Sequence, residues 1–231
     1  RSLAFRSYLG RSLASISESL ERSHGAPLSE TALAAMREEL YALYRQELRP
    51  TPWLKPVLDG LDLPFCVASS SQLERIRLSL ELTGTLDRFK PNIFSASMVA
   101  NGKPAPDLFL HAARAMGVAP EHCLVIEDSP AGIMAARADG MRVFAYIGGG
   151  HIAESGLRAE IERLGPDAIM EDMRALPGLL ELQAARETGA AQLLVAVDVG
   201  TGSARSGIVT PGGQVIGRAE QPIEMQRMDA N

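Results

Sequence analysis

The chain contains 231 residues, of which 46% are hydrophobic and 22% are charged, and its formal net charge at pH 7 is −5. This composition is typical of a globular protein with one large domain or two small ones, and it excludes a disordered chain and a collagen-like fibre. The mild acidity and the lack of a long apolar run indicate neither a nucleic-acid partner nor a membrane span.

The first 50 residues are expected to be helical. Apolar side chains recur there at spacings of three and four residues, which places them on one helix face: Leu33, Met36, Leu40, Leu43 and Tyr44. Pro50, Pro52 and Pro56 then end the helical region, because proline cannot continue a helix interior.

A different pattern follows, in which short apolar runs alternate with helical patterns of roughly 10–15 residues. This alternation predicts an α/β fold with a Rossmann-like parallel sheet and crossover helices. Strands are expected at 65–68, 123–126, 142–146 and 168–170, and helices at 73–82, 106–116, 131–139 and 176–185.

The two cysteines, Cys66 and Cys123, lie in strand-like apolar runs far apart in the sequence. We therefore expect buried reduced thiols rather than a disulfide. No export signal opens the sequence, so we expect a cytoplasmic protein. Because the chain starts at Arg1 and its last segment only begins a new pattern, we also expect it to be a piece of a longer protein.

A second unit is expected after a junction at 187–189. The apolar run Leu193–Val197 predicts a strand, a Gly-rich turn follows it, and Ser206–Thr210 predicts the next strand of a hairpin. We expect residues 189–231 to be only the start of this second domain.

Ser69, Ser70 and Ser71 directly follow the first predicted strand and precede a helix. Their hydroxyls and backbone N–H groups are expected at the carboxyl edge of the sheet and at a helix N-terminus, where anions bind. The alternative is that these serines are plain helix caps.

Lys103 lies in the sequence Gly-Lys-Pro-Ala-Pro-Asp, between a glycine and two prolines. A stiff loop of this kind holds the ammonium group where it can meet a phosphate at a low cost in entropy. The alternative is a solvated loop lysine, and a loop lysine is expected to bury little surface.

Glu127 and Asp128 follow the strand predicted at 123–126. Adjacent carboxylates at a strand end repel each other unless a cation lies between them, and oxygen ligands of this kind suit Mg²⁺. The alternative is a helix-capping Asp128 beside a solvated Glu127.

In this order, the three segments resemble the haloacid dehalogenase superfamily of phosphohydrolases, in its β-phosphoglucomutase-like branch. The resemblance covers about residues 1–185 and rests on Ser69, on Lys103 and on the run Ile-Glu-Asp-Ser-Pro-Ala-Gly-Ile that contains Glu127 and Asp128. It implies that Ser69 binds the transferring phosphoryl group, that Lys103 neutralises its charge, and that Glu127 and Asp128 hold Mg²⁺.

The same resemblance makes residues 1–50 part of a helical cap over the site, with Arg11 in a loop that contacts substrate. It places Ser70 and Gln72 beside the phosphate. An exposed position at a helix end is the alternative for Arg11.

The resemblance also implies an aspartate nucleophile, with a second aspartate two residues later, on a strand that precedes the cap. No such strand precedes the cap in this sequence, so the core at 51–188 is expected to lack its first strand and the chain is not expected to turn over substrate. Asp198 follows an apolar run, but Gly200 stands where the second aspartate is needed, and we reject it as a displaced copy of this motif.

The segment that starts at Val195 instead resembles the N-terminus of the FGGY family of carbohydrate kinases. After Val195 it reads Ala-Val-Asp-Val-Gly-Thr-Gly-Ser. The resemblance implies an actin-like kinase hairpin whose turn lies near the phosphates of ATP. The residues concerned are Asp198, Gly200, Thr201 and Ser203. The alternative is a generic Gly-rich hairpin turn.

The sequence therefore predicts a Mg²⁺-dependent phosphatase that acts on a small phosphorylated metabolite such as a sugar phosphate. A phosphomutase with the same residues is one alternative. A non-catalytic module that binds phosphate or a partner is the other.

Overall fold

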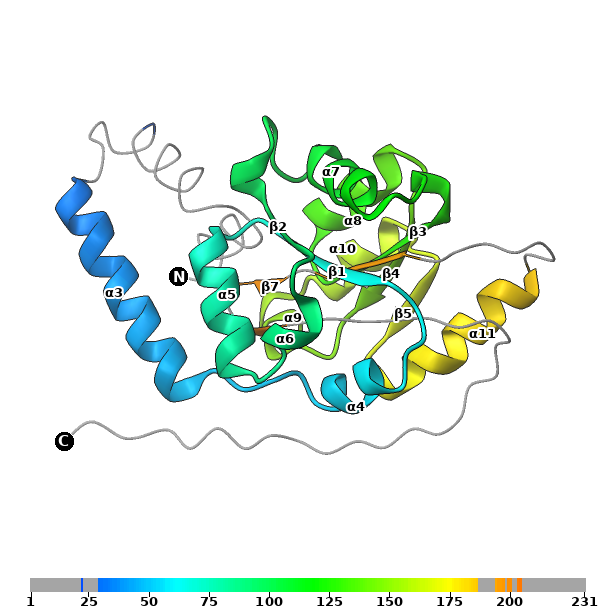
Figure 1. The fold of residues 1–231 in the computed structure, drawn as a ribbon, viewed down its shortest axis with the longest axis horizontal. Coiled ribbons are helices and arrows are strands. Elements are labelled where there is room, and N and C mark those ends of the chain that lie inside the picture. Colours follow the sequence, from blue (N-terminus) through cyan, green and yellow to red (C-terminus); the bar gives the residue numbers. More distant parts are fainter. Residues whose placement is uncertain (1–21, 23–28, 187–193, 198, 201–202, 205–231) are drawn as a thin grey trace.

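The computed structural model describes residue 22, residues 29–186, 194–197 and 199–200, and residues 203–204 (Figure 1). The expected α/β class is confirmed, with a parallel sheet and helices on both of its faces. No helix in the described ranges is long and apolar enough to cross a membrane.

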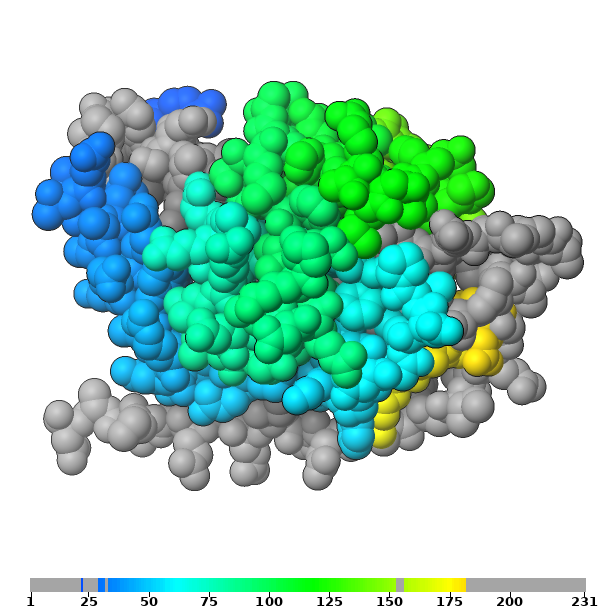
Figure 2. Space-filling view, viewed as in Figure 1, coloured from blue at the N-terminus to red at the C-terminus, as the bar shows by residue number. Residues whose placement is uncertain are grey.

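The N-terminal helical region contains α3 (Glu30–Glu47), followed by α4 (Leu54–Asp59). Tyr41 and Tyr44 of α3 are buried, and α3 contacts α5 (Leu73–Leu82), beside which it lies along one flank of the molecule (Figure 2). Met36 and Leu43 remain 50% and 56% exposed, so the expected apolar face is not buried as a whole. The two tyrosines pack instead because their large rings fill the space against α5.

The main sheet has six strands in the order β2-β1-β6-β3-β4-β5, and all neighbouring pairs are parallel. Four of the strands were expected from the sequence, within one residue of their observed bounds: β1 (Phe65–Ser69), β3 (Cys123–Glu127), β4 (Arg142–Tyr146) and β5 (Ala168–Met170). The edge strand β2 (Ile93–Ser95) was not expected.

Strand β6 (Leu194–Val197) lies between β1 and β3, with Val197 in register with Val67 on one side and Ile126 on the other. We expected this segment to open a separate unit and the sheet to lack a strand. The structure instead places β6 in the sheet, where it pairs with the backbone groups of β1 and β3. A short apolar run fits a parallel strand covered on both faces, but its sequence does not say which sheet it joins.

Two short strands follow β6 and form an antiparallel pair, β7 (Val199–Gly200) with β8 (Ser203–Ala204). The expected hairpin partner, Ser206–Thr210, lies outside the described residues. The second strand that the structure does describe begins three residues earlier than the expected one.

After α5 come α6 (Leu86–Phe89), α7 (Asp107–Met116), α8 (Pro130–Ala138), α9 (Gly150–Ser155), α10 (Arg158–Arg163) and α11 (Leu176–Arg186). The helices α5, α7, α8 and α11 lie within one residue of their expected bounds, whereas α6, α9 and α10 were not expected. Short 3₁₀ turns occupy Ala96–Met98, Pro120–His122 and Met173–Ala175.

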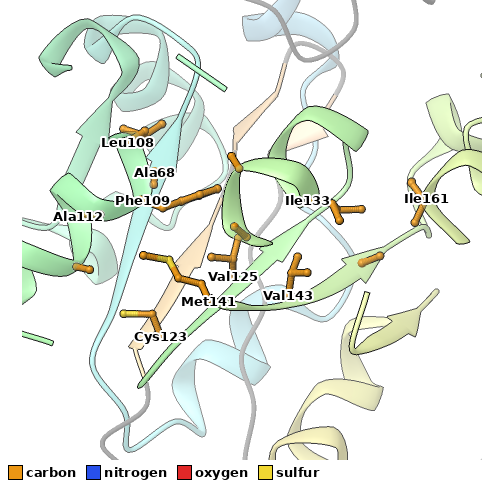
Figure 3. Close-up of a cluster of buried hydrophobic side chains, with 14 of the residues drawn as sticks. Ala68, Leu108, Phe109, Ala112, Cys123, Val125, Ile133, Met141, Val143 and Ile161 are labelled. Atoms are coloured by element: carbon orange, nitrogen blue, oxygen red, sulfur yellow. The ribbon is translucent and has the colours of Figure 1, made fainter. Parts of the chain in front are cut away.

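Alternate residues of each strand point to opposite faces of the sheet and form two cores. On one face, Val67, Ile126 and Phe144 pack with side chains of α4, α5 and α11. On the other face, Val125 and Val143 pack with side chains of α7, α8 and α10 (Figure 3). Because both faces are covered, the polar strand ends are the part of the sheet left for a site.

Cys66 and Cys123 are buried on the second face and are not joined in a disulfide, as expected. Burial raises the pKa of Cys123 to about 11 and raises that of Cys66 further above its ordinary value. Both sulfurs are therefore neutral thiols at pH 7.

Candidate active site

The candidate site lies at the carboxyl edge of the sheet, where the expected residues meet. β1 ends at Ser69 and β3 ends at Glu127, and the two strands flank β6. Parallel strands end at the same edge, so the polar residues that follow them are close in space although they are far apart in sequence.

Lys103 reaches this edge from the loop before α7, and its side chain is only 1% exposed. Its Nζ forms an ion pair with Glu127, donates a hydrogen bond to the Ala68 carbonyl at 3.3 Å, and lies 4.7 Å from the centre of the Phe109 ring. The expectation that a loop lysine buries little surface is wrong, and so is the alternative of a solvated lysine. The aliphatic part is buried because the ammonium has a counter-charge.

Glu127 is fully buried, and its carboxylate has several donors besides Lys103. Its Oε2 accepts hydrogen bonds from the backbone N–H of Asp128 and of Ser129, both at 3.0 Å, and from the Ser129 hydroxyl at 2.9 Å. A Cβ at Gly132 would overlap this carboxylate, so the start of α8 must carry a glycine there. Glu127 is thus placed as the counter-ion of Lys103.

The residue that caps α8 is Ser129, whose Oγ accepts a hydrogen bond from the Gly132 N–H at 3.1 Å. The alternative of a capping Asp128 beside a solvated Glu127 is therefore wrong. Asp128 keeps an 11% exposed side chain at the edge of the sheet.

His151, at the start of α9, faces Asp128, with 3.4 Å between its Nε2 and Asp128 Oδ2. Burial lowers the pKa of His151 to about 4, so the imidazole is neutral at pH 7. Sequence reasoning missed this residue. The signal that could have found it is the run of three glycines, Gly148 to Gly150, that follows β4 at the same edge.

The serine segment folds around its own backbone. Ser69 Oγ accepts a hydrogen bond from the Ser71 N–H at 3.2 Å, and Ser95 donates one to the Ser71 carbonyl at 2.7 Å. The residue before α5 is Gln72, whose side chain makes no capping hydrogen bond. Ser69 is buried, Ser70 is half-buried and Gln72 is exposed.

The comparison with known families decides the assignment of this edge. Residues 5–140, more than half of the chain, match the haloacid dehalogenase-like hydrolases. The chain belongs to this hydrolase family. The superfamily resemblance expected from Ser69, Lys103 and Glu127 is therefore confirmed.

Curated relatives of this haloacid dehalogenase-like chain are phosphatases. The 6-phosphogluconate phosphatase of Escherichia coli is 30% identical over 148 residues, which are 64% of this chain and 67% of that protein. The fructose-1-phosphate phosphatase of Escherichia coli is 33% identical over 128 residues, which are 54% of this chain and 68% of that protein.

Solved structures share the fold of the family. A haloacid dehalogenase-like protein of unknown function from Agrobacterium tumefaciens is 30% identical, with a TM-score of 0.60 over 75% of this chain and 78% of that one. A family hydrolase from Deinococcus radiodurans with bound phosphate and sodium is 25% identical, with a TM-score of 0.52 over 78% and 80%. A Thermotoga maritima protein assigned as a β-phosphoglucomutase shares the fold, with a TM-score of 0.56 at 19% identity over 77% and 79%.

The family implies a magnesium ion, and the residues at the edge fit it in part. Both oxygens of Glu127 are engaged by Lys103 and by the start of α8, so its carboxylate is not presented to a metal. The Asp128 carboxylate fits, because Mg²⁺ keeps several waters and is commonly held by one or two carboxylates together with substrate phosphate oxygens. Within the described ranges, no group of three or more His, Cys, Asp or Glu side chains is arranged around a metal position.

The remaining expected site residues either lie outside the described residues or belong to the short antiparallel pair that follows β6. Arg11, Asp198 and Thr201 lie outside the described residues. Gly200 and Ser203 are paired with each other in β7 and β8. The kinase resemblance of the last 40 residues stays a prediction.

Proposed function

We propose that this chain is a phosphatase module that acts on small phosphorylated metabolites, with sugar phosphates as the substrate class. The observation that supports this most is the buried ion pair of Lys103 with Glu127 at the carboxyl edge of the sheet, beside Ser69. The names of the relatives, which include a 6-phosphogluconate, a hexitol and a fructose-1-phosphate phosphatase, support the substrate class.

The proposed role of Lys103 is to stabilise negative charge on the transferring phosphoryl group. Glu127 and the Ala68 carbonyl fix the position of its ammonium, so little entropy is lost when a phosphate arrives. A fixed charge in a buried position also stabilises a transition state more strongly than a solvated one.

The proposed role of Ser69 is to position the phosphoryl oxygens. Its hydroxyl lies at the end of β1, in the segment that leads to the N-terminus of α5. Backbone N–H groups at a helix start favour an anion in the same place. Ser70 is the half-buried neighbour on this segment, whereas the exposed Gln72 is the outermost residue.

We propose that Asp128 is the carboxylate of this chain that holds Mg²⁺, with His151 keeping it in place from α9. When bound, the ion supplies positive charge against the phosphoryl oxygens. The neutral imidazole of His151 restricts the rotation of the carboxylate without cancelling its charge.

The finer mechanism that we propose is attack of an aspartate carboxylate on the phosphorus with release of the substrate's hydroxyl, followed by hydrolysis of the aspartyl phosphate by water. We identify no such aspartate on a strand before the cap in this sequence. Ser69 and Lys103 do not replace that aspartate, because Lys103 is held in an ion pair with Glu127 and the Ser69 hydroxyl is engaged by the backbone of its own segment. Their expected contribution is binding and charge stabilisation.

The experiment that tests this function is calorimetric titration of the 231-residue chain with inorganic phosphate, with and without MgCl₂. We expect phosphate to bind, and to bind more tightly when Mg²⁺ is present. Asp128→Asn is expected to remove the effect of Mg²⁺. Asp62→Asn, at an exposed carboxylate far from Asp128 in the sequence, is the matched control and is expected to retain the effect of Mg²⁺. No phosphate binding by the wild-type chain would contradict the proposal.

A further inference from the structure

Arg75, in the first turn of α5, is a buried cation without a counter-ion in the described structure. The residue as a whole is only 5% exposed. Nη2 donates a hydrogen bond to Ser71 Oγ at 2.6 Å, while Nη1 has no hydrogen-bond partner within the described ranges. No carboxylate of these ranges forms an ion pair with Arg75.

Tyr44 of α3 presents a second unsatisfied polar atom to the same place. It is 7% exposed, and its hydroxyl has no partner among the residues that the structure describes. Helix α3 contacts α5. Burial raises the pKa of Tyr44, and the charge of Arg75 acts on that pKa in the opposite direction. Glu74, the neighbouring carboxylate on α5, is exposed, and it raises the pKa of Tyr41.

Two buried donors without acceptors are costly to keep. An unpaired buried charge or hydroxyl loses its water without a replacement, and native structures retain such groups rarely. Both the guanidinium N–H and the phenolic O–H can donate, so an acceptor would satisfy them together, and the positive charge of Arg75 favours a negatively charged one. A carboxylate matches, because its two oxygens can accept one hydrogen bond from each donor.

The position of Arg75 connects this place to the phosphate edge. Arg75 donates to Ser71, and the backbone N–H of Ser71 donates to Ser69. Two hydrogen bonds thus separate Arg75 from the serine that is proposed to bind the phosphoryl group.

We propose that Arg75 and Tyr44 bind a carboxylate at the far end of the phosphorylated substrate, which makes phosphorylated sugar acids the substrate class. This inference rests on the proposed function and deepens it. Arg75 and Tyr44 are specificity residues in this assignment, while Ser69 and Lys103 hold the phosphoryl group that all substrates share.

The test compares two open-chain ligands that differ only at the far end, 6-phosphogluconate with a carboxylate and glucitol 6-phosphate with an alcohol. Calorimetric titration of the full chain is expected to show at least about tenfold tighter binding of 6-phosphogluconate, the gain of a charge-assisted hydrogen bond. Arg75→Gln and Tyr44→Phe are expected to reduce this preference to less than about threefold. Arg77→Gln, at an exposed arginine of the same helix, is the matched control and is expected to retain the preference.

The outcomes separate this inference from the proposed function. Equal affinity of the wild-type chain for both ligands, with inorganic phosphate still bound, overturns the carboxylate site alone. Loss of inorganic phosphate binding counts against the proposed function. Gluconate without phosphate gives an independent reading: it is expected to raise the melting temperature of the wild-type chain and not that of Tyr44→Phe, a variant that loses only one hydroxyl. An equal rise in both overturns the site.

Discussion

Lys103 and Arg75 both have buried side chains in the part of the chain that the structure describes, and their surroundings differ. Lys103 has a carboxylate, a carbonyl and an aromatic ring around its ammonium, and these contacts come from residues far apart in the sequence. Arg75 has a single neutral hydroxyl, from its own turn of chain, and a guanidinium nitrogen without a partner in the described structure.

This difference distinguishes a cation that is held in position by its partners from a cation that is available to bind a ligand. A buried charge with a full set of partners is held in place, and its removal leaves the partner carboxylate uncompensated. A buried charge without partners gains them when a ligand arrives. We therefore expect substitutions around Lys103 to reduce stability strongly, and substitutions at Arg75 to change ligand preference instead.

The largest expected effect is that of Glu127→Ala. This substitution leaves Lys103 buried without its counter-ion and also removes an acceptor used by Asp128, Ser129 and the Ser129 hydroxyl. We expect the free energy of unfolding in urea to fall by about 3–5 kcal/mol. Glu121→Ala, at an exposed carboxylate, is the matched control and is expected to change it by less than about 0.5 kcal/mol. A loss below about 1 kcal/mol for Glu127→Ala would show that the ion pair does not stabilise the site.

Gly132→Ala tests the packing behind the same ion pair. A methyl group there overlaps the Glu127 carboxylate and must displace it or the start of α8. We expect a loss of about 1–3 kcal/mol, the usual cost of overpacking a dense region. Gly102→Ala, where a methyl group meets open space, is the control for the change from glycine to alanine. Equal melting temperatures for the two variants would contradict the described contact.

Alkaline pH tests buried groups that have no opposite charge nearby. Burial raises the pKa of Cys123 to about 11 from an ordinary 9.0, and raises that of Cys66 further. Above pH 9 the unfolded chain loses these protons while the folded chain keeps them, so stability is fully present below pH 9 and falls as pH rises. The slope is up to about 1.4 kcal/mol per pH unit for each thiol. Urea unfolding between pH 8 and 10.5 measures it.

The control for this slope is the Cys66→Ala variant, which removes one of the two thiols. We expect a shallower fall in stability above pH 9 than in the wild-type chain, whatever its stability at pH 8. An unchanged slope would show that the Cys66 thiol does not take part. Slow labelling of both cysteines by iodoacetamide at pH 8 is the accompanying expectation, since the thiolate is the reactive form.

Arg75→Met has the smallest expected effect on stability, and the expected change is a gain rather than a loss. Replacing an unpaired buried charge with an apolar side chain of similar length is commonly neutral or stabilising. We expect the free energy of unfolding of the ligand-free chain to change by about 0 to +1 kcal/mol. A loss of more than about 2 kcal/mol would mean that Arg75 already has a partner, and would remove the distinction between the two cations.

Sequence reasoning expected Ser69 and Glu127 at one edge of the sheet, because both follow apolar runs that fold as parallel strands. Ser69, Lys103 and Glu127 meet there since the carboxyl ends of β1 and β3 lie on one edge. The partners of these residues could not be predicted, because a sequence pattern does not show which side chain faces Lys103. The counter-ion role of Glu127 therefore appeared only in the structure.

Other features left weaker signals in the sequence. The unpaired state of Arg75 depends on what α3 and α5 fail to place beside it, and His151 follows a glycine run that has no ligand chemistry of its own. The central position of β6 depends on the space between β1 and β3. Such long-range pairings are set by tertiary packing, which local periodicity does not encode.

The most direct test of the account is the affinity of the full chain for inorganic phosphate when both charges of the buried pair are removed. Lys103→Met with Glu127→Gln leaves no uncompensated charge, so the double variant isolates binding from folding. The account predicts that the dissociation constant for phosphate, measured by phosphorus NMR titration, rises at least about tenfold in the double variant. Lys55→Met, at an exposed lysine of α4, is the control and is expected to leave it unchanged. Unchanged affinity in the folded double variant would contradict the assignment of this edge as the phosphoryl site.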